Sequence, residues 1–179
     1  LQQENLTHMD VVNMALDLCA ALTVCRRSGY CYANLKPGNV FRHGTHYHIG
    51  DLGFLPLYEI GHIPLPEQYR SSYTPPELMD GTHPVNDTAD VYALGLILYQ
   101  AYNGGKLPFA DSAYVSEEAI QMRMMGRPLP PPANVSPALA SVILKACAFY
   151  PADRYQSASA FLSCLDSEKE DHTVLFGSV

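Results

Sequence analysis

The chain of 179 residues carries a formal net charge of -7, with 47% hydrophobic and 16% charged residues. This length and composition suit one packed domain with its own core and argue against an intrinsically disordered chain. The negative charge repels phosphate backbones, which excludes nucleic acid as an expected partner.

Cysteine usage and hydropathy indicate the expected compartment. The five cysteines are odd in number and show no Cys-x-x-Cys pairing, which favours buried thiols over a disulfide framework or a zinc site. The apolar run over residues 91–99 is too short to span a membrane, and no signal peptide is visible. We therefore expect a cytoplasmic protein whose present segment makes no membrane contact.

The first predicted elements are a helix and a hairpin. Apolar residues recur at helical spacing over residues 9–25, and Gly29 is suited to end that helix. Residues 39–50 hold two strand-like runs on either side of a His-Gly turn, which predicts a β-hairpin. Residues 54–76 contain several prolines without a regular period, and a long irregular segment is expected there.

A buried central helix is predicted next. Residues 91–99 are apolar on nearly every face, as in a helix that is surrounded by protein. Asp87 and Asp90 suit its N-terminus, and the glycine pair at 104–105 suits its end.

Three shorter helices are predicted to follow. They lie over residues 116–125, after a Ser136 cap with Pro137 in first position, and around Phe161. Residues 167–179 look like a tail. The sequence thus predicts one mainly α domain over residues 1–166, with a single small hairpin.

One group of residues points to metal chemistry. Lys36 and Asn39 lie in a Pro-Gly turn just before the hairpin, and Asp51 follows the hairpin. A folded hairpin brings its two ends together, and with them the Asn39 amide and the Asp51 carboxylate. Such oxygen ligands suit Mg²⁺, although each motif alone is common by chance.

Five motifs in order are far more specific than any one of them. They are "YANLKPGN" at 32–39, "DLG" at 51–53, "PPE" at 75–77, "DVYALG" from Asp90, and "YPADRYQ" around Arg154. This series resembles the C-terminal lobe of a eukaryotic-type Ser/Thr protein kinase, bacterial members most of all. The resemblance implies a helical bundle around a buried central helix with a small β-hairpin. It also implies a catalytic-loop equivalent at 30–40 and an activation segment at 51–77.

The resemblance assigns roles to individual residues. Lys36 would reach the γ-phosphate of ATP, Asn39 and Asp51 would hold Mg²⁺, and Phe41 would lie under the adenine. Asp90 would accept backbone N–H groups from the catalytic loop. Glu77 and Arg154 would form a buried structural ion pair.

Three departures from the family pattern disfavour catalysis. Asn34 occupies the position of the catalytic aspartate, and a carboxamide cannot take the proton of a substrate hydroxyl. Loss of a general base typically costs roughly 10²–10⁴-fold in rate. Ala33 replaces the arginine that pairs with an activation-segment phosphate, and Arg70 stands where many members have a threonine.

The sequence shows no glycine-rich loop, strand lysine or partner glutamate of a kinase N-lobe. The chain also begins at Leu1 without a methionine. We therefore expect a piece with the N-lobe absent and half of an ATP site. ATP and Mg²⁺ are then expected in the complete protein and no cofactor in this chain alone. The uncovered upper face suggests a protein partner, the N-lobe of the same protein, or self-association.

Three functions remain open at this point. The favoured one is a pseudokinase with a binding or regulatory role. The others are a fragment of an active ATP-dependent Ser/Thr protein kinase and a stand-alone helical interaction module. The hairpin histidines at 43, 46 and 48 are interpreted as exposed turn and strand residues rather than a metal site.

Overall fold

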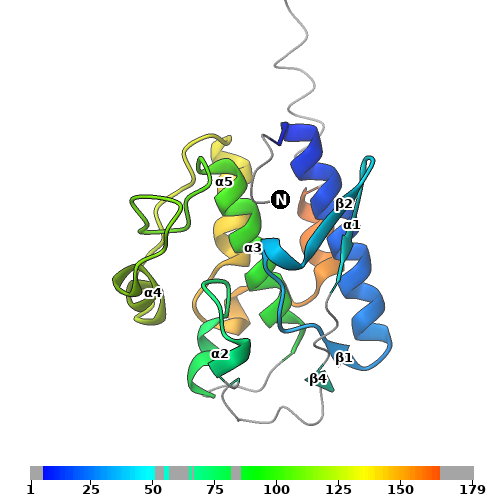
Figure 1. Cartoon of the computed structure of the whole chain (residues 1–179), viewed down its shortest axis with the longest axis horizontal. Coiled ribbons are helices and arrows are strands. Elements are labelled where there is room, and N and C mark those ends of the chain that lie inside the picture. The colour runs from blue at the N-terminus through cyan, green and yellow to red at the C-terminus, as the bar shows by residue number, and fades with distance from the viewer. Residues whose placement is uncertain (1–5, 51–54, 57–64, 66, 82–85, 166–179) are drawn as a thin grey trace, which may run out of the picture.

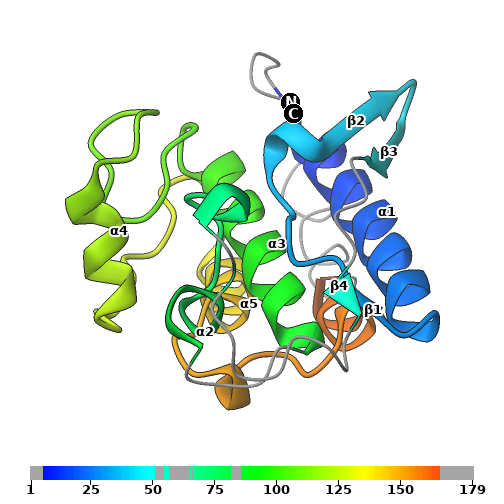
Figure 2. The same cartoon turned by 60° about the horizontal axis from the view of Figure 1, so that its bottom comes forward.

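The computed structural model describes residues 6–50, 55–56, 65, 67–81 and 86–165. Helix α3 (Asp87–Tyr102) runs through the middle of the domain. Helix α1 (His8–Arg27) lies on one side of it, and α4 (Glu117–Met124) lies on the opposite side, as Figures 1 and 2 both show. Helix α5 (Pro137–Ala146) packs against α3. The predicted mainly helical architecture around a central helix is confirmed for this part of the chain.

The remaining elements are short. They are β1 (Tyr30–Cys31), η1 (Pro37–Asn39), β2 (Val40–His43), β3 (His46–Ile49), β4 (Leu55–Pro56), η2 (Glu67–Tyr69), α2 (Pro76–Asp80), η3 (Pro151–Asp153) and a last helix over 158–165. The predicted hairpin is confirmed as an antiparallel β2–β3 pair with Val40 opposite Ile49. The antiparallel β1–β4 pair and helix α2 were not predicted, and the predicted tail at 167–179 lies outside the described residues.

Side-chain caps begin the main helices, and of these caps Ser136 of α5 was predicted. The hydroxyls of Ser116 and Ser136 accept from backbone N–H groups three residues later, at the starts of α4 and α5. Thr7 and Asp10 cap α1 reciprocally. At α3 the cap is Asn86, which accepts from the Thr88 N–H at 2.9 Å, while Asp87 lies in the first turn. The aspartates therefore complement the helix dipole rather than cap the helix.

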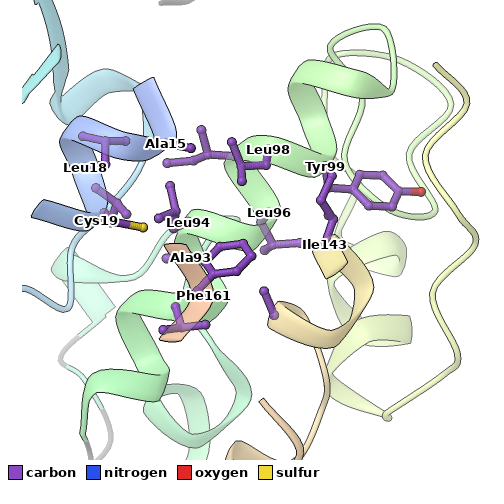
Figure 3. Packing of buried hydrophobic residues seen from close by; sticks show 14 of the residues in the cluster. Ala15, Leu18, Cys19, Ala93, Leu94, Leu96, Leu98, Tyr99, Ile143 and Phe161 are labelled. Carbon is purple, nitrogen blue, oxygen red and sulfur yellow. The ribbon is translucent and has the colours of Figure 1, made fainter. Parts of the chain in front are cut away.

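The core forms where α1, α5 and the last helix over 158–165 meet α3. Figure 3 shows Ala15, Leu18 and Cys19 of α1 directed toward Leu94 and Leu98 of α3. On another face of α3, α5 approaches at Gly95, where an added Cβ would lie 2.7 Å from the Cys147 sulfur. Glycine at this position therefore sets the spacing of the two helices. Four cysteines are buried, Cys164 is partly buried, and all five are free thiols, as predicted.

Helix α1 is also long and apolar enough to cross a membrane by composition alone, with a mean hydropathy of 1.3 in its most apolar window. We did not predict this membrane-length helix, because the apolar run at 91–99 was the one tested against the length of a membrane span. One face of α1, from Val11 to Cys25, is buried in the domain, where it contacts α3 and β3. Packing inside the domain accounts for its apolar composition.

Arg154 and Glu77 join distant parts of the chain. Arg154 donates from Nη1 and Nη2 to the two carboxylate oxygens of Glu77 at 2.6 and 2.8 Å. Both side chains are buried, with exposures of 0% and 2%. The remaining donors of Arg154 bond to main-chain carbonyls at Thr88, Ala148 and Phe149. The predicted pair is present and fully hydrogen-bonded, which is the condition for a buried ion pair to be tolerated.

Asp90 shapes the segment that follows β1. Its carboxylate accepts from the backbone N–H groups of Tyr32 and Ala33 at 2.8 and 2.7 Å. The Cys31 thiol lies 3.2 Å from the same carboxylate. Two adjacent N–H groups directed at one carboxylate give the backbone a sharp bend at residues 32–33. The geometry expected for Asp90 is therefore found.

Replacing Arg154 should destabilise the domain severely. Arg154→Met leaves the Glu77 carboxylate buried without its cation, which costs about 3–5 kcal/mol. For a domain of this size, that loss lowers Tm by roughly 10 °C. The double variant with Glu77→Gln should recover part of the loss, because the stranded charge is removed. Calorimetry of both variants checks this, with exposed Arg27→Gln as control; an unchanged Tm in Arg154→Met would contradict it.

Asp90 should also link stability to pH. Burial is the largest influence and raises the pKa of Asp90 from 3.8 to about 6, against the lowering effect of the Tyr32 and Ala33 N–H groups. The folded state then holds the proton more tightly than the unfolded state. This contribution is fully present below about pH 4 and is lost as pH rises through about 6.

Asp90→Asn removes this titration. The free energy of unfolding of the parent, relative to that of the variant, should be greater near pH 4 than near pH 7 by at most about 3 kcal/mol. Urea denaturation at fixed ionic strength measures the difference. A difference that does not change with pH would show that Asp90 keeps its ordinary pKa.

Candidate functional site

The segment from β1 to η1 has an unusual backbone. Ala33 adopts φ of 55°, in the left-handed region that non-glycine residues seldom enter. Such conformations cost of order 1–3 kcal/mol and persist only where the surroundings enforce them. The bond from the Ala33 N–H to Asp90 supplies that constraint. The bend turns the chain toward Asn34 and the Pro-Gly turn.

Asn34 and Asn39 lie against each other within this segment. The amide nitrogen of Asn39 donates to the Asn34 backbone carbonyl at 2.9 Å, and Asn39 is only 5% exposed. This bond leaves the Asn39 amide oxygen as the group to offer a ligand. The Asn34 side-chain oxygen is buried and has no hydrogen-bond partner. Two acceptor oxygens are therefore held close to one turn, and at least one of them needs a donor.

Lys36 immediately precedes the Pro-Gly turn. Its side chain is partly buried, and within the described part of the chain no carboxylate forms an ion pair with it. An ammonium group without an internal counter-charge is suited to bind an anion. Lys36 thus adds a cationic group beside the acceptor oxygens.

The hairpin presents an aromatic ring near the same turn. Phe41 is 56% exposed, and its ring lies so close to Gly50 that an added Cβ would fall 2.5 Å from it. The Gly50 N–H donates to the Asn39 carbonyl at 2.9 Å, and the Tyr32 hydroxyl bonds to the Gly50 carbonyl. Gly50 is therefore fixed next to Asn39. Asp51, the predicted second metal ligand, lies outside the described residues.

The hairpin is supported by α1. The Tyr47 N–H donates to the Asp17 carboxylate at 2.8 Å, and Arg42 pairs with Asp10 at 3.0 Å. His46 lies 3.5 Å from Asp17, but no group of three metal-ligating side chains occurs among the described residues.

The end of the predicted activation segment shows which residues sequence reasoning missed. Arg70, which stands where many members of the resembled family have a threonine, donates from Nε to the Leu65 carbonyl at 2.6 Å. Buried Thr74 accepts from the Ser71 N–H at 2.8 Å and closes a local turn. Arg123 of α4 donates to the Ser72 carbonyl at 2.8 Å. The Ser-x-x-Thr spacing could have predicted the turn, whereas no local pattern predicts the contact from α4.

The arrangement can bind a charged ligand. A cationic ammonium, an amide oxygen for a hard cation and an exposed aromatic ring are contributed by residues 34–41. Bonds to Asp90 and Gly50 fix the backbone at Tyr32, Ala33 and Asn39, and Phe41 lies on the paired strand β2. These groups suit a phosphate-bearing ligand with an apolar ring. The position that should accept a proton holds a neutral amide.

Comparison with known proteins gives the family. A sequence model of the protein kinase domain matches residues 1–164. The serine/threonine-protein kinase Pkn1 of Myxococcus xanthus is 33% identical over 175 residues, covering 90% of this chain and 24% of that protein. The probable serine/threonine-protein kinase PknB of Corynebacterium glutamicum is 27% identical, covering 86% and 25%. A Wee1-like protein kinase of Oryza sativa subsp. japonica is 25% identical, covering 60% and 20%.

The chain thus spans about a quarter of the length of these curated relatives. The family match begins at residue 1, so it gives no support to the expectation that the N-lobe is absent. The match covers nearly the whole chain, and bacterial serine/threonine kinases are among the relatives. This chain belongs to the protein kinase family, as a bacterial-type serine/threonine protein kinase domain.

Proposed function

We propose that the protein is a pseudokinase, or a kinase impaired in phosphoryl transfer, and that this chain supplies its C-terminal lobe. The observation that carries the proposal is the neutral Asn34 at the base position, with a buried side-chain oxygen that has no partner. Its work is binding or regulation in the cytoplasm. Retained nucleotide binding belongs to the complete protein.

The chemistry of Asn34 separates orientation from proton transfer. Its amide oxygen can accept a hydrogen bond from an acceptor hydroxyl, which orients that hydroxyl. It cannot take the proton, and loss of a general base typically lowers the rate roughly 10²–10⁴-fold. Phosphoryl transfer depends mainly on positioning and charge stabilisation, so a residual rate is expected without a general base. The base position acts on the acceptor hydroxyl and not on the nucleotide, so nucleotide binding is retained.

Ala33 supports a regulatory state that does not depend on a phosphate switch. An arginine at this position would pair with a phosphate on the activation segment and order it. Ala33 offers no charge, although its backbone is still held by Asp90. The loop shape is maintained by main-chain contacts, without the side chain that would respond to phosphorylation.

The ligand-holding groups are retained. Lys36 would contact the terminal phosphates, and Asn39 would contribute an amide oxygen to Mg²⁺ together with Asp51. Mg²⁺, when bound, would neutralise phosphate charge. Phe41 would form the floor of the adenine pocket, and its exposed ring suits coverage by an N-lobe, by a partner protein or by a second copy.

Restoring the base should restore turnover. In the full-length protein, Asn34→Asp should raise phosphate transfer to a generic protein acceptor by at least tenfold, because a carboxylate can take the hydroxyl proton. Nucleotide affinity should remain unchanged. Radiolabelled transfer measures this, with Asn34→Ala as the matched control. Ordinary kinase rates in the unmodified protein would instead establish the active-kinase alternative.

Binding should depend on the retained ligands. Nucleotide with Mg²⁺ at about 100 times its Kd adds roughly 2.7 kcal/mol of stability, or several degrees in Tm. The shift should require Mg²⁺ and disappear in Asn39→Ala, while the exposed Asn134→Ala should retain it. No Mg²⁺-dependent shift with any nucleotide would favour the stand-alone interaction module.

A further inference from the structure

Arg123 is a buried arginine whose guanidinium is only partly bonded. It lies in the last turn of α4 and is 2% exposed. Nη1 donates to the Ser72 carbonyl at 2.8 Å. Nε and Nη2 are buried and have no hydrogen-bond partner. A buried charged donor without an acceptor carries a large desolvation cost, so this group needs an explanation.

Arg154 shows what a completed site looks like in the same domain. Its guanidinium is equally buried, yet Nη1 and Nη2 bond to Glu77, and Nε bonds to the Ala148 carbonyl. No ion pair is made by Arg123 with any carboxylate in the described part of the chain. The partial negative charge at the C-terminus of α4 favours a cation there but supplies no acceptor to the two nitrogen atoms.

Arg123 lines a pocket that is large enough for a small ligand. The pocket has a volume of about 150 Å³ and lies between the end of α4 and the end of α5. Its lining includes Tyr92, Arg123, Arg127, Leu129, Cys147 and Phe149, and it contains no acidic residue. Burial raises the pKa of Tyr92 to about 12, so that side chain is uncharged. Two arginines therefore give the pocket its charge.

The unbonded atoms indicate the class of ligand. Nε and Nη2 lie on one edge of the guanidinium plane, the edge that forms parallel bonds to two oxygens of a carboxylate or phosphate. A phosphate monoester carries about -1.5 to -2 charges at neutral pH, which balances two arginines better than a single carboxylate does. We propose that Arg123 and Arg127 form a binding site for a phosphate group.

Entry of the ligand requires a small movement, because both nitrogen atoms are covered. Residues 126–129 form the wall after α4 and belong to no helix or strand. Gly126 begins this wall with φ of 69°, and its packing against the Phe149 ring leaves little room for a side chain. Arg127 follows directly and is exposed, so its charge is accessible from solvent. The site is distinct from the Lys36 turn and does not require nucleotide.

Phosphate binding tests the proposal on the full-length protein. Inorganic phosphate should raise Tm in a saturable manner at constant ionic strength, and acetate should raise it much less. O-phosphoserine distinguishes the two possible sources of the phosphate group. Tighter binding than that of inorganic phosphate indicates a phosphorylated residue as the ligand, and equal or weaker binding indicates the free ion. Saturable binding in either arm that Arg127→Gln weakens supports the site, and binding in neither arm overturns it.

Variants assign the binding to this pocket. Arg127→Gln should weaken phosphate binding at least tenfold without changing Tm in its absence, since the side chain is exposed. Arg123→Lys should abolish binding, because an ammonium lacks the two-nitrogen edge. Arg27→Gln, a remote exposed arginine, and Lys36→Ala, which removes the nucleotide-site cation, should both leave phosphate binding intact. Loss in Lys36→Ala with retention in Arg127→Gln would overturn the proposal and place the phosphate at the nucleotide site.

Discussion

One guanidinium, that of Arg154, connects the three regions on which the site depends. Through Glu77 it holds helix α2, which begins at the end of the predicted activation segment. Through the Thr88 carbonyl it reaches the first turn of α3, and through Ala148 and Phe149 it fixes the chain after α5. Charge burial is tolerated here because every donor group has an acceptor. A hydrophobic pair of similar volume could fill this space but could not bind three main-chain carbonyls at once.

Asp90 provides the second connection, from α3 to the predicted catalytic-loop equivalent at 30–40. It binds the backbone of Tyr32 and Ala33 rather than their side chains. The loop can therefore keep its shape while the side chains at positions 33 and 34 change. In this fold the residues that hold the backbone of the loop differ from those that determine its chemistry. A neutral Asn34 is therefore compatible with an otherwise ordered site.

Local rules predicted most of the helices and the hairpin. The apolar period and the Ser136 cap predicted the start of α5, because both signals lie within a few residues of one another. Helix α4 was predicted over 116–125, but its Ser116 cap was not. The β1–β4 pair escaped prediction, since each strand has two residues and too short a pattern to detect. The positions of Glu77 and Arg154 followed only from family resemblance, because they are 77 residues apart in sequence.

Arg123 marks the limit of sequence reasoning about the site. An arginine in the last turn of a helix is well explained by the helix dipole, and that pattern favours an exposed side chain. Its burial arises from the segment around Ser72 and the wall after α4, which lie far apart in the chain. The expectation for Asp51 falls outside the described residues, whereas the preceding Gly50 donates its N–H to the Asn39 carbonyl.

The position of α4 has a consequence for motion. It stands apart from α1, α3 and α5 in both views, and its buried side chains are Ala119 and Arg123 (Figures 1 and 2). Helices with few buried apolar groups open locally, whereas a helix buried on all sides opens only with the whole domain. Amide hydrogens of α4 should therefore exchange with solvent long before those of α3. The α4 edge can loosen and reclose while the scaffold around Arg154 stays folded.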